Sequence, residues 1–250
     1  MRLLTYNILD GGVGRADPLA EVMLANDPDV VALIEAEDDE QVRRIATRLS
    51  MDVVPAPGRS RQCVLLSRLP VTSSVNHGLA SDGPRSCVEC EVNGLPIAVV
   101  HLHPHRPRHD EDQRLREIGF VLGKLERHRV AGRPHVIMGD FNSVSPLQHV
   151  EESKLRPGDL HGLRENENTF PRDVVQTMLD SYYVDVFAEL NPKTVANAGT
   201  LDTIHAGLRV DYVFAWGFPP EALLDAKIET DRLAKYASDH YPVVAELKWP

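Results

Sequence analysis

Hydrophobic positions along the chain form short apolar runs that alternate with longer stretches of helical periodicity. The short runs are rich in Val, Ile and Leu and predict β-strands. They cover Arg2–Tyr6, Asp29–Ile34, Gln62–Leu66, Ile97–Val100, Val136–Met138, Val210–Ala215 and Val243–Leu247. Several runs, such as Val30–Ile34, are apolar at every position. We therefore expect both faces of these strands to be buried between layers.

Stretches with apolar residues every three or four positions predict helices. They cover Pro18–Ala25, Asp39–Leu49, Asp110–His128 and Asp173–Leu190. Because no repeat or long linker divides the chain, we expect one domain over residues 1–250. Doubly buried strands that alternate with helices favour an α/β sandwich of two sheets. The segments His103–Asp112 and Glu151–Pro171 lack such a pattern and are expected at the surface.

The composition narrows the class of protein. The 250 residues include 27 basic and 37 acidic side chains, so the formal net charge is −10. This balance argues against binding nucleic acid by charge alone. No apolar run approaches the roughly 20 residues that a membrane-spanning helix needs, and the first residues lack a signal-peptide core. We expect a cytoplasmic protein without membrane insertion or an obligate protein partner.

Three cysteines, Cys63, Cys87 and Cys90, are too few for a disulfide framework. Cys87 and Cys90 form a single C-x-x-C without a second pair to complete a zinc site. On a strand their side chains would face opposite sides. We therefore expect buried, reduced thiols.

Polar residues that suit catalysis follow several predicted strands. Asp140 and Asn142 come after Val136–Met138, where they could orient a water and contact a phosphoryl oxygen, although the same pattern also forms a simple Asx turn. Asp211 stands in an otherwise apolar strand, and an unpaired buried carboxylate costs several kcal/mol. His240 is the obvious partner, since an imidazole oriented by a carboxylate suits proton transfer.

Further oxygen-bearing side chains stand at strand ends. Asn7 ends the first predicted strand, Glu35 ends the second with Glu37 two residues on, and Asp239 precedes His240. Hard oxygen ligands without cysteine favour Mg²⁺ or Mn²⁺.

Seven segments in a fixed order carry a family resemblance. They are Thr5–Leu9, Ile34–Glu35, Leu66–Pro70, Val100–Leu102, Gly139–Asn142, Arg209–Tyr212 and Ser238–His240. Together they resemble the endonuclease/exonuclease/phosphatase superfamily, which includes pancreatic-type deoxyribonucleases, abasic-site endonucleases, deadenylases, sphingomyelinases and inositol-phosphate 5-phosphatases. The resemblance spans nearly the whole chain. It implies a four-layer, deoxyribonuclease-like α/β sandwich and a phosphoester hydrolase that requires Mg²⁺ or Mn²⁺.

The resemblance also implies roles for the metal ligands and for the groups around the attacking water. Glu35 would be the principal metal ligand, with Asn7 and Asp239 sharing the same ion or a second one. Asp140 would align or deprotonate the water, and Asn142 would hold a phosphate oxygen.

The two histidines would act on the scissile phosphate. His240, paired with Asp211, would serve as a base or stabilise the pentacovalent phosphorane. His101 would be the second histidine there. Abasic-site enzymes of the superfamily commonly have Tyr at this position, so His101 argues against that subgroup.

The sequence departs from the family pattern in two places. Ile34 precedes Glu35 where the family usually has Gln. The segment Gly58–Cys63 lacks the carboxylate that often orients the histidine at position 101, and Gln62 is the nearest substitute.

The substrate class stays open between a small or lipid-headgroup phosphodiester and a nucleic acid, with phosphomonoesters also possible. The segment Arg106–His109, with Arg114 and Arg116, would favour a nuclease if it gripped flanking phosphates. Otherwise these arginines form a solvated face that balances Asp110–Asp112. Thr169–Arg172 is a further candidate loop on the substrate side.

Two rival functions use the same residues. His101, His103 and His105 would share one face of a strand and could bind zinc with Asp140 or Asp239. Prolines at 104 and 107 suggest, however, that the strand ends near residue 102. The other rival is a non-catalytic phosphate-binding scaffold, which would require the loss of a central residue.

Overall fold

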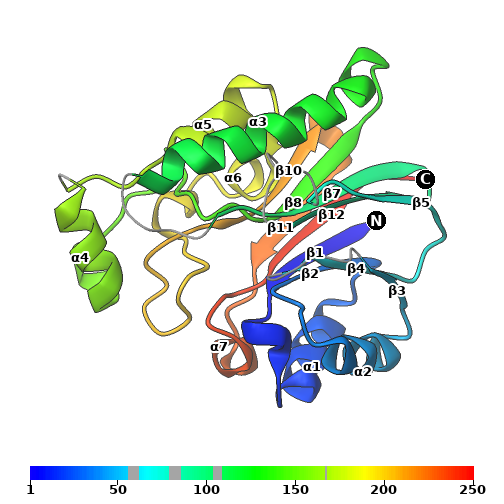
Figure 1. Ribbon diagram of the computed structural model, residues 1–250, viewed down its shortest axis with the longest axis horizontal. Coiled ribbons are helices and arrows are strands. Elements are labelled where there is room, and N and C mark those ends of the chain that lie inside the picture. The colour runs from blue at the N-terminus through cyan, green and yellow to red at the C-terminus, as the bar shows by residue number, and fades with distance from the viewer. Residues whose placement is uncertain (56–61, 79–85, 104–108, 167) are drawn as a thin grey trace.

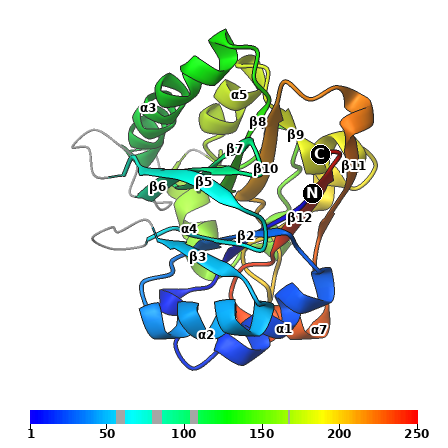
Figure 2. The same ribbon diagram turned by 90° about the vertical axis from the view of Figure 1, so that its right-hand side faces the viewer.

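The computed structural model describes residues 1–55, 62–78, 86–103, 109–166 and 168–250. Two six-stranded sheets pack face to face, and helices cover the outer face of each sheet (Figures 1 and 2). The arrangement is the predicted two-sheet α/β sandwich, with four layers in the order helix, sheet, sheet, helix. None of the described helices combines the length and apolar character needed to cross a bilayer.

The first sheet has the strand order β11-β12-β1-β2-β4-β3. Its strands are β1 (Arg2–Asn7), β2 (Val30–Ile34), β3 (Asp52–Pro55), β4 (Val64–Ser67), β11 (Leu223–Ile228) and β12 (Val243–Leu247). β1 and β2 run parallel, whereas the other neighbours are antiparallel.

The second sheet has the order β5-β6-β7-β8-β10-β9. Its strands are β5 (Val71–Asn76), β6 (Ser86–Val92), β7 (Leu95–His101), β8 (His135–Asp140), β9 (Val184–Asp185) and β10 (Asp211–Trp216). Here β7 and β8 form the parallel pair. Each sheet therefore has one central parallel pair.

Each outer layer packs on its own sheet. Helices α1 (Ala16–Asn26), α2 (Asp39–Leu49) and α7 (Arg232–Ala237) pack on the first sheet, and α3 (His109–Val130) and α5 (Asp173–Asp180) pack on the second. The remaining helices are α4 (Pro157–Glu165), α6 (Val186–Leu190) and the short 3-10 helices η1 (Asp10–Gly12), η2 (Glu152–Lys154), η3 (Val195–Asn197) and η4 (Pro220–Ala222). In Figure 1, α4 lies away from the sheets, beyond the start of α3.

The space between the sheets is filled by alternate side chains of both. Leu3 of β1 points into this layer, whereas Leu4 points toward the helices. Met138 of β8 enters the same layer from the second sheet. Each fully buried aliphatic side chain contributes about 1.5–3 kcal/mol relative to exposure. The central strands are apolar at every position because one face packs against the other sheet and the opposite face packs against the helices.

The predicted helix over Asp173–Leu190 is wrong. The helix α5 stops at Asp180, and Tyr182 adopts a left-handed backbone with φ of 63°. The chain then forms β9, which pairs with β10. The Asp185 carboxylate accepts a hydrogen bond from the Ala188 amide at 3.2 Å and so begins a separate helix, α6. Helical periodicity continued through the segment, but local backbone geometry and strand pairing divided it.

The sequence pattern also missed the strands β3, β5, β6, β9 and β11. The strand β5 is largely exposed and lies at a sheet edge, so it lacks the apolar run that marks a central strand. The strand β6 carries Glu89 and Glu91 among its apolar residues. The apolar pattern therefore does not identify strands that lie at a sheet edge or carry charged side chains.

The cysteines lie as the alternation of a strand predicts. Cys87 and Cys90 are both in β6, and Cys87 faces the helical layer while Cys90 faces the other sheet. All three cysteines are free and buried. Burial raises the pKa of Cys63 and of Cys90 to about 12, so these thiols stay protonated at neutral pH.

The buried carboxylate of Glu89 in β6 connects the helix α3 to the second sheet through hydrogen bonds. Glu89 Oε1 accepts hydrogen bonds from His128 Nε2 at 2.7 Å and Arg127 Nη2 at 2.5 Å, and Glu89 Oε2 bonds His77 Nε2 at 2.8 Å. Burial alone would raise the pKa of Glu89, but these three partners lower it to about 2. The carboxylate is therefore ionised whenever the protein is folded near neutral pH.

Replacing Glu89 with Gln should lower the free energy of unfolding at pH 7 by about 1–3 kcal/mol, because it removes a buried charge that holds three partners. An unfolded glutamate has a pKa of about 4.3. Since the folded pKa is lower, the stabilisation is fully present above pH ~4.3 and is lost as the pH falls toward 2. Urea denaturation of both proteins from pH 7 down to the acid limit should show the difference shrinking below about pH 5.

The matched control is Glu91→Gln, two residues along β6. Glu91 forms a partly exposed ion pair with Arg133 at 2.8 Å, so its loss should lower the free energy of unfolding clearly less than the loss of Glu89. Equal losses in the two variants at pH 7 would contradict the assigned role of Glu89.

Candidate active site

The two central parallel pairs deliver polar side chains to one edge of the sandwich. In the first sheet, Asn7 at the end of β1 lies opposite Ile34 at the end of β2, and Glu35 is the next residue after Ile34. In the second sheet, His101 lies opposite Asp140. The Asn7 side chain crosses to the second sheet, where its Nδ2 donates to Asp140 Oδ2 at 3.1 Å. The carboxyl ends of both pairs therefore meet, as is common for sites built on parallel strands.

Asp140 lies at the centre of the site and is almost fully buried. Its Oδ1 accepts a hydrogen bond from the Asn142 amide at 2.9 Å, and its Oδ2 accepts from Asn7. His101 Nε2 lies 3.9 Å from the same Oδ2. Hydrogen bonds from two N–H groups thus fix the direction in which this carboxylate points, and the His101 ring lies beside it.

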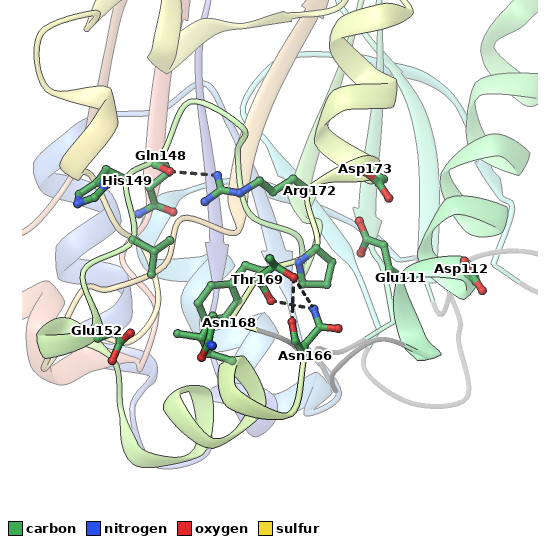
Figure 3. A pocket seen from close by; sticks show the side chains of 14 residues that line it. Glu111, Asp112, Gln148, His149, Glu152, Asn166, Asn168, Thr169, Arg172 and Asp173 are labelled. Carbon is green, nitrogen blue, oxygen red and sulfur yellow. Dashed lines mark hydrogen bonds between the residues drawn. The ribbon is translucent and has the colours of Figure 1, made fainter.

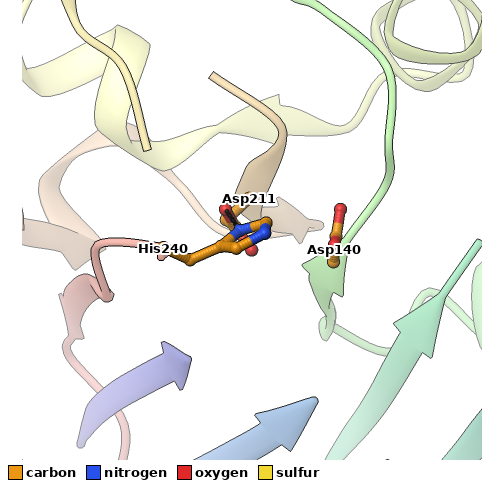
Figure 4. Close-up of side chains that lie close together, drawn as sticks. All are labelled: Asp140, Asp211 and His240. Carbon is orange, nitrogen blue, oxygen red and sulfur yellow. Dashed lines mark hydrogen bonds and ion pairs between the residues drawn. The ribbon is translucent and has the colours of Figure 1, made fainter. Parts of the chain in front are cut away.

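Asp211 begins β10 directly opposite Asp140 in the antiparallel register. Its Oδ2 is 2.8 Å from His240 Nδ1, so the structure contains the imidazole partner that the sequence predicted for this carboxylate. The other ring nitrogen of His240 faces Asp140 (Figure 4). One ligand atom from each of Asp140, Asp211 and His240 lies within 4.8 Å of the others.

Burial and charge shift the titration of this group. Burial, together with the neighbouring Asp211 carboxylate, raises the pKa of Asp140 to about 7. Burial alone would lower the pKa of His240, but Asp211, with smaller contributions from Asp140 and Asp239, raises it to about 10. His240 is therefore cationic at neutral pH, where the Asp140 carboxyl group is near the midpoint of its titration.

Asn142 adopts a left-handed backbone with φ of 48°. Its amide bond to Asp140 is the Asx turn that the D-x-N pattern allowed, and its Nδ2 donates to Leu102 O at 3.2 Å. One Nδ2 hydrogen remains for another acceptor. A strained conformation held by two contacts is typical of a functional position.

The three predicted metal ligands come from adjoining backbone segments. Glu35 has φ of 57°, and its Oε2 accepts from the Asp10 amide at 3.2 Å. Ser238 Oγ donates to Asn7 O at 2.7 Å, which brings the following Asp239 beside β1.

The donor chemistry fits a divalent cation. Asp239 Oδ1 is buried and accepts no hydrogen bond among the described residues. An anionic oxygen in that state is stabilised by a cation. Asn7 Oδ1 accepts from Leu9 N at 3.1 Å and keeps a second lone pair. Glu37, in contrast, is exposed.

The prediction that Arg114 could contact flanking phosphates of a nucleic acid is wrong. Arg114 is fully buried, where its Nε donates to Glu111 Oε2 at 2.8 Å and its Nη1 to His103 O at 3.2 Å. It therefore neither reaches a bound polyanion nor belongs to a solvated face. Arg116 is exposed on α3. Residues 104–108, which include His105, Arg106 and Arg108, lie outside the described residues.

The three-histidine zinc arrangement does not extend along a strand. The strand β7 ends at His101, and the His103 backbone is held by Glu117 and Arg114 instead. His105 lies outside the described residues, as do residues 58–61, which precede Gln62 and lack a carboxylate. The alternation that would align the three imidazoles therefore fails after His101.

Sequence reasoning missed two hydroxyl groups that position the site. Thr200 Oγ1 accepts hydrogen bonds from the amides of Val210 at 3.1 Å and Asp211 at 3.2 Å. Ser238 holds the end of β1. Ser238 directly precedes the Asp239–His240 pair, so its place in that motif could have indicated a positioning role. The sequence around Thr200 carries no such signal, because its contact forms only when the chain folds back to β10.

A model of the Endonuclease/Exonuclease/phosphatase family matches residues 4–240. The chain belongs to this family. The family places it among metal-dependent phosphoester hydrolases. A search of curated protein sequences found no significant match.

Solved structures share the fold at low sequence identity. An AP endonuclease from Archaeoglobus fulgidus is 19% identical with a TM-score of 0.73, and both chains are covered completely. A 3′ phosphatase from Neisseria, solved with a product DNA hairpin, is 20% identical with a TM-score of 0.76 and complete coverage of both chains. Truncated TDP2 from Caenorhabditis elegans is 18% identical with a TM-score of 0.64, covering 98% of this chain and 96% of that one. These likenesses support the deoxyribonuclease-like fold.

Gly139 allows β7 and β8 to approach beside the site. Its φ is 142°, and a Cβ there would lie 2.0 Å from Val100 O. Gly139→Ala should therefore lower the free energy of unfolding by at least about 2 kcal/mol, through strain and a clash with backbone. Chemical denaturation measures this loss.

Gly123→Ala on α3 is the matched control, because a Cβ there meets nothing within 4 Å. Higher helix propensity should leave that variant unchanged or more stable by up to about 1 kcal/mol. A Gly139→Ala protein as stable as this control would show that the strand approach is not tight.

Proposed function

We propose that the protein is a phosphodiesterase that depends on Mg²⁺ or Mn²⁺ and hydrolyses its substrate by in-line attack of water. The observation that carries this proposal is the position of Asp140. Its carboxylate is bonded to Asn7 of the opposite sheet and lies against the His240–Asp211 pair. A carboxyl group with a pKa of about 7 beside a charged imidazole suits proton transfer at neutral pH.

Glu35, Asn7 and Asp239 would hold the cation. Their oxygens match the ligand preference of Mg²⁺ and Mn²⁺, and the buried Asp239 Oδ1 without a hydrogen-bond donor supports this assignment. When bound, the ion would polarise a phosphoryl oxygen and offset its negative charge.

Asp140 orients the attacking water and takes its proton. The hydrogen bonds from Asn7 and Asn142 hold the carboxylate in one direction, so little reorganisation is needed when the proton moves. The remaining Nδ2 hydrogen of Asn142 donates to a phosphate oxygen. Asn142 thereby links the position of the phosphate to that of Asp140.

Two imidazoles stabilise the charge that develops on the phosphorane. Asp211 holds His240 through Nδ1 and keeps it protonated, which leaves Nε2 to donate to a phosphoryl oxygen. His101, beside Asp140, is the second imidazole on the scissile phosphate. Fixed donors of this kind supply much of the rate in phosphoryl transfer.

A compact diester is the substrate class that we favour over a long nucleic acid. The formal charge of −10 opposes contact with an extended polyanion. The buried ion pair of Arg114 removes one cation from the surface that a duplex would contact. A nuclease remains the second candidate, because a fold neighbour from Neisseria was solved with DNA.

Asp140→Asn and His240→Ala should each lower kcat for bis-p-nitrophenyl phosphate by about 100-fold or more, since each removes a proton-transfer or charge-stabilising group. Assays with Mg²⁺ or Mn²⁺, and with chelator alone, measure the loss and the metal requirement. Asp52→Asn, at an exposed position on β3, is the control and should keep wild-type activity. Turnover without metal, or wild-type rates in either site variant, would refute the proposed chemistry.

Glu35→Gln should weaken activation by Mn²⁺ at least about 10-fold, because a neutral amide replaces the principal anionic ligand. Calorimetric titration of the protein with Mn²⁺, beside the activity titration, separates binding from turnover. Glu37→Gln, two residues on and exposed, is the matched control. Identical Mn²⁺ affinities in wild type and Glu35→Gln would remove Glu35 from the ligand set.

A further inference from the structure

A pocket of about 680 Å³ lies between the segment that follows β8, the helix α4 and the start of α5 (Figure 3). Polar side chains dominate its lining, including Gln148, Asn166, Thr169 and Arg172. Glu111, at the start of α3, closes one side. The proposed mechanism uses none of these residues.

The pocket adjoins the candidate active site through the chain itself. Ser143, the residue after Asn142, donates from Oγ to Glu111 Oε1 at 3.1 Å. The guanidinium of Arg172 donates through Nη1 to Ser145 O. Because Asn142 and Ser145 are three residues apart, their Cα atoms lie at most about 11 Å from each other. Arg172 is therefore fixed to the same short segment that carries Asn142, the residue that we assign to the phosphate.

A second connection joins the pocket to β10. Gln148 Oε1 accepts from the Arg209 amide at 2.9 Å, and Gln148 Nε2 donates to Ala198 O at 2.6 Å. Arg209 stands two residues before Asp211. One wall of the pocket is thus fixed to the segments that carry both Asp140 and Asp211.

Arg172 differs from the buried arginines Arg114 and Arg209 because no carboxylate among the described residues neutralises its charge. Arg114 is paired with Glu111 at 2.8 Å, and Arg209 with Asp185 at 2.7 Å. Arg172 is partly buried and donates through Nη1 to two backbone carbonyls, and among the described residues it forms no ion pair with a carboxylate. Burial lowers the pKa of Arg172. A guanidinium in this state is stabilised by an anionic ligand.

The acidic residues around the pocket do not supply that anion. Glu111 is occupied by Arg114, Ser143 and the Val174 amide. Asp112, Glu152 and Asp173 also line the pocket, but these residues are exposed. Exposed charges are screened by solvent and salt, whereas the partly buried guanidinium is screened less. The lining therefore combines exposed carboxylates and the paired carboxylate of Glu111 with the partly buried guanidinium of Arg172.

We infer that this pocket is a second phosphate subsite, in which Arg172 binds a phosphate group of the substrate other than the scissile one. The inference rests on the proposed phosphodiesterase function and extends it to a substrate class. A diester that carries a nearby terminal phosphate would place one phosphate at Asn142 and the other at Arg172. The exposed carboxylates disfavour a chain with many further phosphates, so a compact bisphosphorylated substrate fits best.

The experiment compares matched substrates that differ only in a terminal phosphate. One pair is the dithymidine dinucleotide with and without its 5′ phosphate, and the other is the diester of two glycerols with and without a terminal phosphate. In the wild type, the terminal phosphate should raise kcat/KM by about 10-fold or more, mainly through KM, as charge-assisted hydrogen bonds predict. A higher kcat/KM in both pairs indicates that the subsite recognises the phosphate alone. A higher kcat/KM only with dithymidine indicates that it recognises the phosphorylated end of a nucleotide.

Arg172→Gln should abolish the preference for the terminal phosphate, and Arg172→Lys should keep part of it. Arg164→Gln removes a charge from the exposed face of α4 outside the pocket lining, and should keep the full preference. Calorimetric binding of the same substrates to the Asp140→Asn background tests the subsite without turnover. Loss of the preference in Arg164→Gln as well would assign the effect to overall charge and overturn the inference.

Two failures are distinguishable. A wild-type protein that hydrolyses bis-p-nitrophenyl phosphate and the plain diesters, but shows no gain from a terminal phosphate, would refute the subsite and leave the proposed function standing. A wild-type protein without metal-dependent turnover of any diester would refute the proposed function, and the inference with it.

Discussion

The hydrogen bond from Asn7 to Asp140 crosses from one sheet to the other, and the candidate site depends on the packing that makes this contact possible. Alternate side chains from both sheets fill a common core, so the two central parallel pairs cannot shift relative to each other without opening it. Glu35 enters from the same edge as Asn7, and His101 from the same edge as Asp140. Apolar packing therefore sets the geometry of polar groups that share no local sequence.

Burial gives the same residues their chemical character. In water, Asp140 would be an ordinary ionised carboxylate. Inside the sandwich, desolvation and the adjacent Asp211 raise its pKa to about 7, while the Asp211 charge keeps His240 protonated despite desolvation. The backbone strain at Glu35 and Asn142 lies in the same region, and it persists because the surrounding strands and hydrogen bonds hold both residues. The packed core therefore maintains both the backbone strain and the shifted pKa values of these residues.

The sequence predicted the central strands because their apolar runs reflect burial on both faces. It also pointed to candidate site residues because polar side chains follow those runs, and their catalytic and metal-binding roles stay predictions. Edge strands such as β5 were missed because exposure removes the apolar signal. The helix predicted over residues 173–190 failed because periodicity does not register a left-handed residue such as Tyr182 or the pairing of β9 with β10. Thr200 and the charge balance of Arg172 depend on contacts between distant segments, which a pattern along the chain does not contain.

The acidic surface and the phosphate chemistry are compatible because they act over different distances. Charges on the surface are screened within about 8 Å at physiological ionic strength, so the net charge of −10 chiefly affects extended ligands that lie along the surface. In the proposed mechanism, a phosphate that enters the site would meet His240 and the Asn142 side-chain amide, which are buried and therefore weakly screened. The substrate that we propose, with two phosphates, would occupy both the site and the guanidinium of Arg172. A longer polyanion would bring additional phosphates against exposed carboxylates such as Asp112 and Asp173.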